Sequence, residues 1–303
     1  MPQPGLHLLL ADEALTRWKP AGAVAQTLTE LPFDSSAPAA RNAFLHGALA
    51  PDMGFFPGGP QPLSEVVHEE GSSRMLRALL ERAQTAEQRA YAWGWLTHVL
   101  ADVLLHPIVN AGADELAEAR GVTETADWLV AHVQIEVGLD ATHLQRGVHR
   151  RLRLEPALDE RSIEFVADAF ADVYDLHWSP VRLAAVHRNV TRFTNACLPF
   201  VAMVGRSARA DRNGGSFWTP TRHLLARWVG RRAPAHGFLV PILPTRDLLH
   251  RVAHARRIFH TTLDSLLARG VGDLPDYDLD RGLPLRDVRT EEPGLLAPAI
   301  AVS

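Results

Sequence analysis

The sequence predicts an all-α protein, a multi-helix bundle built around one buried central helix. Three observations predict this fold class. Apolar residues recur with helical spacing between proline and glycine breaks along most of the 303-residue chain. No stretch alternates apolar and polar residues for long enough to form a sheet. One stretch, residues 85–110, is apolar nearly all round, which is typical of a helix at the centre of a bundle.

The predicted central helix has recognisable ends. Thr85 and Gln88 have the spacing of a capping box, in which each side chain binds a free backbone N–H group of the first turn. Alanine, leucine and tryptophan fill the interior, and Pro107 comes near the end. We expect Gly112 to begin the next break.

Three ionisable residues interrupt this apolar helix at intervals of four: His98, Asp102 and His106. At about 100° per residue, all three project from one stripe. A carboxylate between two imidazoles is costly to bury without a partner, and a divalent metal ion is the simplest partner for all three. The alternative is a hydrogen-bonded network inside the core.

Other helices are expected on both sides of the central one. Ser36 is placed to cap the second of them, and Asp52 then follows on a loop beyond Pro51. A helical turn is expected over residues 63–68. The further helices are expected over residues 4–18, 37–50, 73–83, 123–145, 158–176, 180–206, 219–231 and 244–269.

The predicted organisation has three parts. Residues 1–145 form a metal-binding helical core, and residues 146–270 form a helical extension that shapes the substrate pocket within the same compact domain. Residues 271–303 are rich in proline, aspartate and glycine without periodicity, so we expect an irregular C-terminal tail.

Composition limits the classes of partner. A net charge of −4 gives no sign of attraction to nucleic acid, and Cys197 is the only cysteine, so thiolate ligation is not expected. The first residues lack the pattern of a secretory signal, and no apolar run reads as a transmembrane segment. The expected location is therefore the cytoplasm.

A second helix repeats the pattern of the first. In residues 123–145, His132 and Glu136 are four apart. Nitrogen and oxygen ligands of this kind suit zinc at a catalytic site, and manganese or iron would also accept them. The number of candidates suits two or three ions. The full set of predicted metal ligands is His7, Asp52, His68, His98, Asp102, His106, His132 and Glu136.

In the order and context of these residues, the chain resembles the zinc-dependent phospholipase C family, which includes single-strand nucleases of the same fold. The resemblance covers about residues 1–145. It is carried by His7 in an N-terminal helix, Ala48-Leu-Ala-Pro-Asp52, Val67-His68, the run from His98 to His106, and His132-Val-Gln-Ile-Glu136.

The resemblance implies a helical fold and a ligand set for each ion. Asp52, His68, His98 and Asp102 would hold one zinc, and His106, His132 and Glu136 a second. His7 would hold a third with Asp102 as a bridge. Secreted bacterial members use an N-terminal tryptophan at the third ion, whereas six residues precede His7 here. The spacing within the central helix is more similar to the glycosylphosphatidylinositol-specific phospholipase D branch and its cytoplasmic bacterial relatives.

The implied activity is metal-dependent hydrolysis of a phosphoester, with a lipid or another small phosphodiester as substrate and no nucleic acid. Asp52 is the expected catalytic residue, because it can orient the attacking water or accept its proton. Two alternatives stay open. The same cluster can serve a non-phosphate substrate in a biosynthetic pathway, through hydrolysis, cyclisation or elimination, or it can belong to a non-catalytic metal-binding module.

Overall fold

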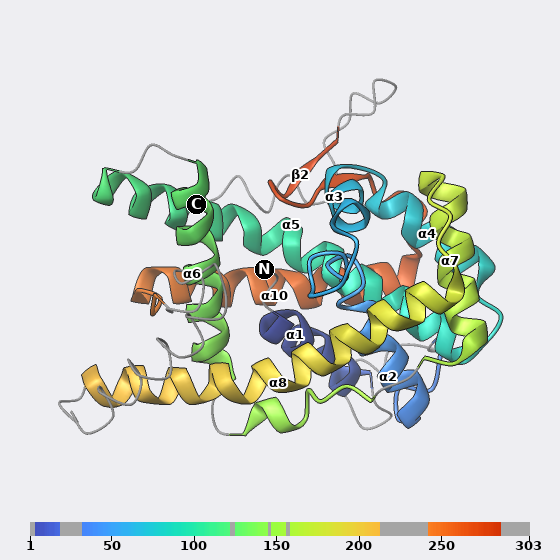
Figure 1. Cartoon of the computed structure of the whole chain (residues 1–303), viewed down its shortest axis with the longest axis horizontal. Helices are drawn as coiled ribbons and strands as arrows, with labels where there is room; N and C mark the ends of the chain where they lie inside the picture. The colour runs from blue at the N-terminus through green and yellow to red at the C-terminus, as the bar shows by residue number, and fades with distance from the viewer. Residues whose placement is uncertain are drawn as a thin grey trace. The chain divides into compact units, whose positions relative to one another are not determined.

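The computed structural model describes residues 4–18, 32–121, 125–144, 147–155, 158–212 and 242–285. Helices make up nearly all of the described secondary structure, which confirms the predicted all-α class (Figure 1). The helices are α1 (Pro4–Arg17), α2 (Pro38–Gly47), α3 (Gln61–Glu69), α4 (Ser72–Arg82), α5 (Ala86–Arg120), α6 (Thr125–His143), α7 (Glu160–Tyr174), α8 (Pro180–Arg212) and α10 (Arg246–Arg269), with a 3-10 turn at Val148–Arg150.

The chain divides into two compact units, and each is described by itself. The first unit contains residues 1–6, 108–153 and 194–252, and the second contains residues 7–107, 154–193 and 253–303. The predicted division into residues 1–145, 146–270 and 271–303 stays a prediction.

The predicted central helix is α5. Every residue from Ala90 to His106 is buried, as its all-round apolar sequence indicates. The capping box at its start is confirmed, because the Gln88 backbone N–H donates to the Thr85 hydroxyl at 3.2 Å and the Gln88 side-chain oxygen accepts from the Thr85 N–H at 3.3 Å. The sequence pattern thus fixes where this helix begins.

Two local predictions were wrong. The helix does not break at Gly112 but continues to Arg120, because this glycine allows close packing: a Cβ atom there would lie 3.2 Å from the Ile135 side chain of α6. Ser36 does not cap α2, since its hydroxyl donates to the Asp34 carboxylate at 2.6 Å. The helix expected over residues 219–231 lies outside the described residues.

In the second unit, α2 crosses α5 at very close range. A Cβ atom on Gly47 would lie 2.1 Å from the carbonyl oxygen of Tyr91, and one on Gly94 would lie 2.0 Å from that of Phe44. Only glycine at both positions lets the two backbones approach this closely. The crossing places the residues that follow α2 next to the middle of α5.

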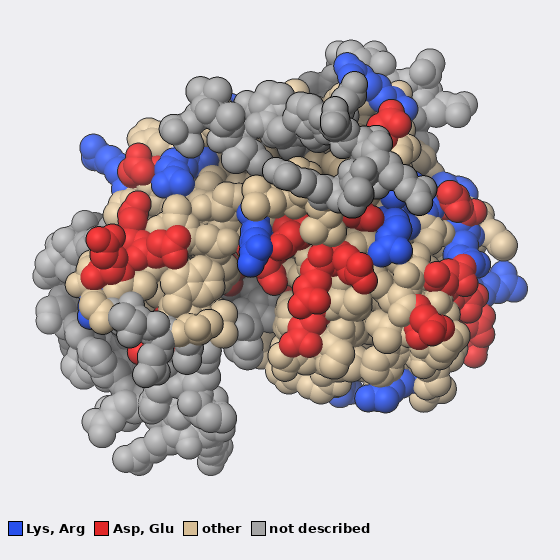
Figure 2. Space-filling model, turned by 90° about the horizontal axis from the view of Figure 1, so that it is seen from above, with Lys and Arg blue, Asp and Glu red and all other residues tan. Residues whose placement is uncertain are grey.

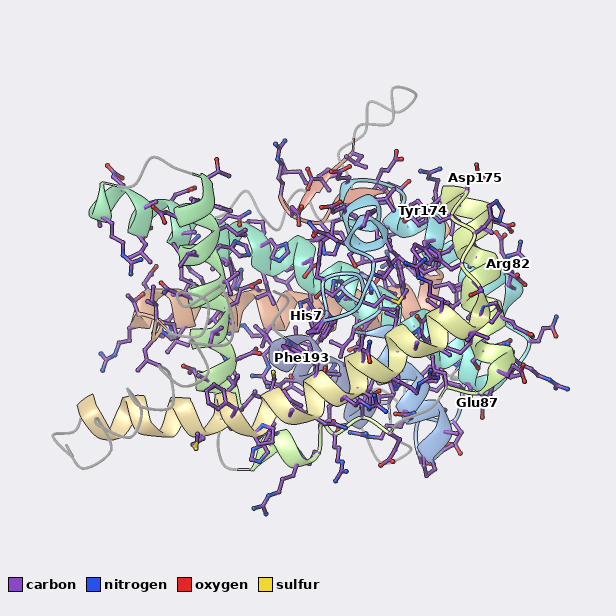
Figure 3. All side chains as sticks on the ribbon, in the orientation of Figure 1. His7, Arg82, Glu87, Tyr174, Asp175 and Phe193 are labelled. Carbon is purple, nitrogen blue, oxygen red and sulfur yellow. The ribbon has the colours of Figure 1, made fainter. Side chains whose placement is uncertain are left out.

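Helix α7 packs against α4 in the same unit (Figure 1). Arg82 pairs with Asp172 of α7, and the Tyr174 hydroxyl donates to the carbonyl of Glu70 at 3.1 Å. Figure 3 shows Tyr174 at one end of α7 and Arg82 beside that helix. These contacts fix α4 and the residue Glu70 before it against α7.

The C-terminal part of the second unit includes a feature that the sequence pattern did not predict. After α10, the strands β1 (Tyr277–Asp278) and β2 (Leu283–Pro284) pair in antiparallel fashion, with Tyr277 opposite Pro284. Strands of two residues are too short to show a periodic pattern. Tyr277 is fully buried, so this segment belongs to the core of its unit.

The first unit contains α6 and the first turn of α1. The buried carboxylate of Asp140 accepts hydrogen bonds from the backbone N–H groups of Gly5 at 2.8 Å and Leu6 at 2.7 Å. A carboxylate at this position satisfies two of the free N–H groups at the start of a helix and interacts favourably with the helix dipole. Asp140 therefore anchors the N-terminal end of α1.

Among the described residues, α5 is the helix whose length and hydropathy alone would suit a membrane span. Within its most apolar window of 18 residues, 72% is buried inside the protein. The central helix of a bundle meets the same criterion, so this property is accounted for by its place in the core.

Candidate metal centre

Four elements of the second unit bring ionisable side chains to one place. Helix α5 contributes the stripe of three residues that the sequence predicts, α1 contributes His7, α3 contributes His68, and the turn after α2 contributes Asp52. Five of these side chains are buried and His7 is nearly so. Six of the eight predicted ligands therefore converge on Asp102 or Asp52.

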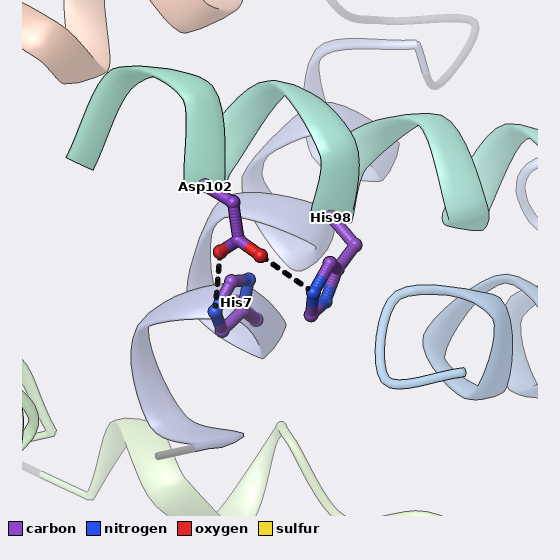
Figure 4. A group of neighbouring side chains, drawn as sticks. All are labelled: His7, His98 and Asp102. Atoms are coloured by element: carbon purple, nitrogen blue, oxygen red, sulfur yellow. Dashed lines mark ion pairs between the residues drawn. The ribbon is translucent and has the colours of Figure 1, made fainter. Parts of the chain in front are cut away.

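Asp102 is the centre of the cluster, and its two oxygens face different imidazoles. Its Oδ1 atom lies 3.3 Å from Nε2 of His7 and 3.8 Å from Nε2 of His106. Its Oδ2 atom lies 2.9 Å from Nε2 of His98 and 3.5 Å from Nε2 of His68. Figure 4 shows the carboxylate between the rings of His7 and His98, which stack with their centroids 4.3 Å apart.

Asp52 supplies a second carboxylate on one side of this cluster. Its Oδ1 atom lies 3.3 Å from Nε2 of His68 and 3.8 Å from Nε2 of His98. The turn that carries Asp52 is closed by a hydrogen bond from the Phe55 N–H to the Asp52 carbonyl at 2.9 Å, and the Phe55 ring packs on His68. As predicted, this residue lies just beyond the end of a helix.

Three imidazoles are oriented through their second nitrogen. The Nδ1–H groups donate to backbone carbonyls: His68 to Ser64 at 2.8 Å, His98 to Ala48 at 2.9 Å and His106 to Leu279 at 2.6 Å. A neutral histidine that donates from Nδ1 presents the lone pair of Nε2, which is the state that binds a cation. In each case, Nε2 is the atom that faces the carboxylates, as in metal sites whose histidines are held by outer hydrogen bonds.

The donor atoms fit a bound cation. Nε2 of His98 and Oδ2 of Asp102 are buried and lie 2.9 Å apart, but neither makes a hydrogen bond of good geometry. Two ligands of one tetrahedral zinc ion lie roughly 3.3 Å apart when each is about 2.0 Å from the metal. Within the second unit, two groups have ligand atoms within 4.8 Å of one another: His7 with His98 and Asp102, and Asp52 with His68 and His98.

The charges of the cluster lead to the same conclusion. Burial alone would raise the pKa of Asp102, but the neighbouring imidazoles, His98 first, hold that pKa well below its usual value. Burial alone would lower the pKa of His68, but Asp102 and Asp52 raise it well above 6.5. The two carboxylates therefore stay ionised and attract positive charge, which a divalent cation supplies as well as a proton does.

His7 differs from the other imidazoles. Burial, and then the nearby His98, lowers its pKa from 6.5 to about 4. It is therefore neutral at neutral pH, which is the state in which an imidazole binds a metal.

The remaining predicted ligands, His132 and Glu136, lie in the first unit. Both are on α6, one turn apart, with 3.3 Å between Nε2 of His132 and Oε1 of Glu136. Their position on one face of one helix is as predicted. Their role as ligands of a second ion together with His106 stays a prediction, because His106 belongs to the other unit.

The backbone partners of the three imidazoles were not predicted from the sequence. A carbonyl group has no sequence signature, and Leu279 lies 173 positions from His106. Only the partner of His98 had an indication in the sequence. Ala48 lies in the short turn after α2 that also carries the predicted ligand Asp52, so its backbone was expected near the central helix.

A set of buried imidazoles and carboxylates on the helices of an all-α protein can hold divalent cations of the kind found in metal-dependent hydrolases. A comparison with known protein families identifies the family of metal-dependent hydrolases. Residues 7–185 match the zinc-dependent phospholipase C family, and the chain belongs to it. The protein is therefore placed among zinc-dependent hydrolases. Neither the curated proteins nor the solved structures that were compared with the chain gave a match.

Proposed function

We propose that this protein is a phosphodiesterase that hydrolyses a lipid or other small phosphoester with two or three zinc ions. One observation carries the proposal: two buried carboxylates, Asp52 and Asp102, share the Nε2 atoms of His68 and His98 as neighbours. Nitrogen and oxygen ligands of this kind are those of catalytic zinc.

The surroundings of Asp102 support the proposal of more than one ion. One of its oxygens faces His68 and His98, and the other faces His7 and His106. A carboxylate with ligands on both sides is suited to bridge two cations. A further ion would use the ligands predicted on α6.

When bound, zinc lowers the pKa of a coordinated water towards neutrality and neutralises charge on the phosphoryl oxygens. The protein contributes position and a proton acceptor. Burial would raise the pKa of Asp52, but His98 and His68 hold it below 3.8, so its carboxylate is ionised at neutral pH. Asp52 can therefore orient the water for in-line attack and accept its proton.

The substrate class is supported by charge. The chain carries a net charge of −4, and on the described part of the face in Figure 2 acidic side chains lie among basic ones. Binding of a polyanion depends on many lysine and arginine contacts to phosphates. This surface therefore favours a small or lipid phosphoester over nucleic acid.

The test compares two substrate types on zinc-loaded protein. We expect turnover of bis-p-nitrophenyl phosphate and release of the headgroup from phosphatidylcholine, with no comparable turnover of p-nitrophenyl acetate. A chelator should abolish the activity and added zinc should restore it. Turnover of the carboxylic ester alone would support the reading with a non-phosphate substrate. Bound zinc without turnover of any ester would support the non-catalytic module.

A further inference from the structure

Residues 274–282, called the strap here, follow α10 and lie outside the region that matches the family. The strap is anchored first on α4. The Asp276 carboxylate accepts hydrogen bonds from the backbone N–H groups of Ser73 at 2.8 Å and Arg74 at 3.0 Å, at the start of that helix. The Ser73 hydroxyl donates to the carbonyl of Pro275 at 2.6 Å.

The strap then contacts two helices that carry predicted zinc ligands. The N–H group of Leu279 donates to the backbone carbonyl of His68 on α3 at 2.9 Å. The carbonyl of the same residue accepts the Nδ1–H of His106 on α5 at 2.6 Å. Leu279 is fully buried, so water does not compete for either bond. Leu279 thus binds the backbone of one predicted metal ligand, His68, and the imidazole of another, His106.

The far end of the strap is fixed against α5 beside His106. Gly282 has a φ of +65°, and a Cβ atom there would lie 2.5 Å from the carbonyl oxygen of Val103 and 2.7 Å from Cγ of Pro107. Only glycine combines this backbone conformation with this close approach. Any larger residue must push the strap away from the helix.

We propose that the strap is a positioning element of the metal centre, in which the Leu279 carbonyl sets the tautomer and the ring orientation of His106. The carbonyl holds the proton on Nδ1, so that Nε2 faces Asp102. The proposal rests on the role of His106 as a zinc ligand in the proposed function. Loss of an outer hydrogen bond of this kind lowers metal affinity by roughly 10- to 100-fold.

The experiment compares Gly282→Ala with Gly270→Ala. Both glycines have positive φ, so both variants place alanine in an unfavourable backbone conformation, but a Cβ atom on Gly270 has no neighbour within 4 Å. The full-length protein is labelled with ¹⁵N in its histidines and studied without zinc. His106→Gln identifies the His106 Nδ1–H signal by its loss, and zinc affinity is measured by competition with a chelator.

We expect the His106 Nδ1–H to exchange faster with solvent in Gly282→Ala, and zinc affinity to fall by roughly 10- to 100-fold. Gly270→Ala should match the wild type in both measurements. A folded Gly282→Ala with an unchanged signal and unchanged affinity overturns the proposal. If that variant does not fold, Asp276→Ala releases the strap without added bulk and is judged by the same two results. The NMR measurement needs no turnover, so inactivity of the wild type on phosphodiesters would overturn the proposed function alone.

Discussion

Nε2 of His98 lies 2.9 Å from Oδ2 of Asp102, one turn further along α5, and neither atom makes a hydrogen bond of good geometry. Buried polar atoms are almost always paired, because an unpaired one loses the hydrogen bonds that water would give it. Both atoms are also directed by their surroundings: the Ala48 carbonyl orients His98, and four imidazoles surround Asp102. The helix therefore holds two donor atoms ready for one cation.

Replacement of Asp102 by asparagine should remove zinc and activity together. The amide has nearly the same shape but no charge, and it cannot bridge cations between the imidazoles on its two sides. We expect sub-stoichiometric zinc by elemental analysis and a fall in phosphodiester turnover of more than about 100-fold, since even outer-shell changes cost 10- to 100-fold.

The matched control for Asp102→Asn is Asp264→Asn. Asp264 pairs with Arg17 between α10 and α1, and it is not among the predicted ligands. The Asp264→Asn variant should bind as much zinc as the wild type and hydrolyse the phosphodiester at the same rate. Equal zinc content in Asp102→Asn and the wild type would contradict the assignment of this centre.

Removal of the metal should destabilise the protein. Without a cation, the cluster holds two carboxylates and several imidazoles in a buried site, whereas a bound ion stabilises only the folded state. At free zinc of 100 times the dissociation constant, the gain is about 2.7 kcal/mol. Thermal unfolding in chelator and in zinc should therefore differ by several degrees. Asp102→Asn should show no such difference, and a wild type insensitive to zinc would argue against the site.

Two buried histidines outside the metal centre should each make a contribution to stability that falls in mild acid. His46 and His187 have ring centroids 5.5 Å apart, and burial lowers both pKa values, that of His187 to well below 6.5. The unfolded chain binds these protons near pH 6.5, whereas the folded protein does not. Each histidine therefore removes up to about 1.4 kcal/mol of stability per pH unit as the pH falls from 6.5 towards its folded-state pKa.

Urea unfolding of zinc-free protein at a series of pH values measures this effect. His187→Phe should give a shallower loss of stability below pH 6.5 than the wild type. The control is His177→Asn, because His177 is exposed and pairs with Asp175 at the surface. If His187→Phe and the wild type lose stability in parallel, these buried histidines do not control the acid response.

The capping box of α5 can be tested independently of the metal. Thr85→Ala removes the hydroxyl that accepts the Gln88 N–H, which should cost about 1 kcal/mol of unfolding free energy. Thr85→Ser should restore most of it. Zinc content should not change in either variant, because the cap lies three turns from His98. A change below the error of the measurement would mean that the core alone fixes the start of α5.

The sequence predicts the candidate ligands of this site better than it predicts the backbone groups that orient them. His98, Asp102 and His106 form a local pattern, since helical geometry places residues four apart on one face. Two of the carbonyls that orient the imidazoles come from Ala48 and Leu279, and side-chain identity says nothing of a backbone contact across 50 or 173 positions. Gly112 shows the same limit: a glycine that would end an isolated helix is retained here for packing against α6.

Asp140 should matter for stability because it anchors the start of α1. The anchored residues, Gly5 and Leu6, directly precede His7. The Asp140 carboxylate accepts two backbone N–H groups, from Gly5 and Leu6. Asp140→Ala leaves both groups buried without a partner, so we expect a loss of about 1–2 kcal/mol in unfolding free energy. Burial raises the pKa of Asp140 from 3.8 to about 7, because a buried carboxyl group is costly to ionise, so the wild type should lose stability relative to Asp140→Ala as the pH rises from 4 to 7. The deficit of Asp140→Ala should therefore be larger at pH 5 than at pH 8, and an equal deficit at both would contradict this assignment.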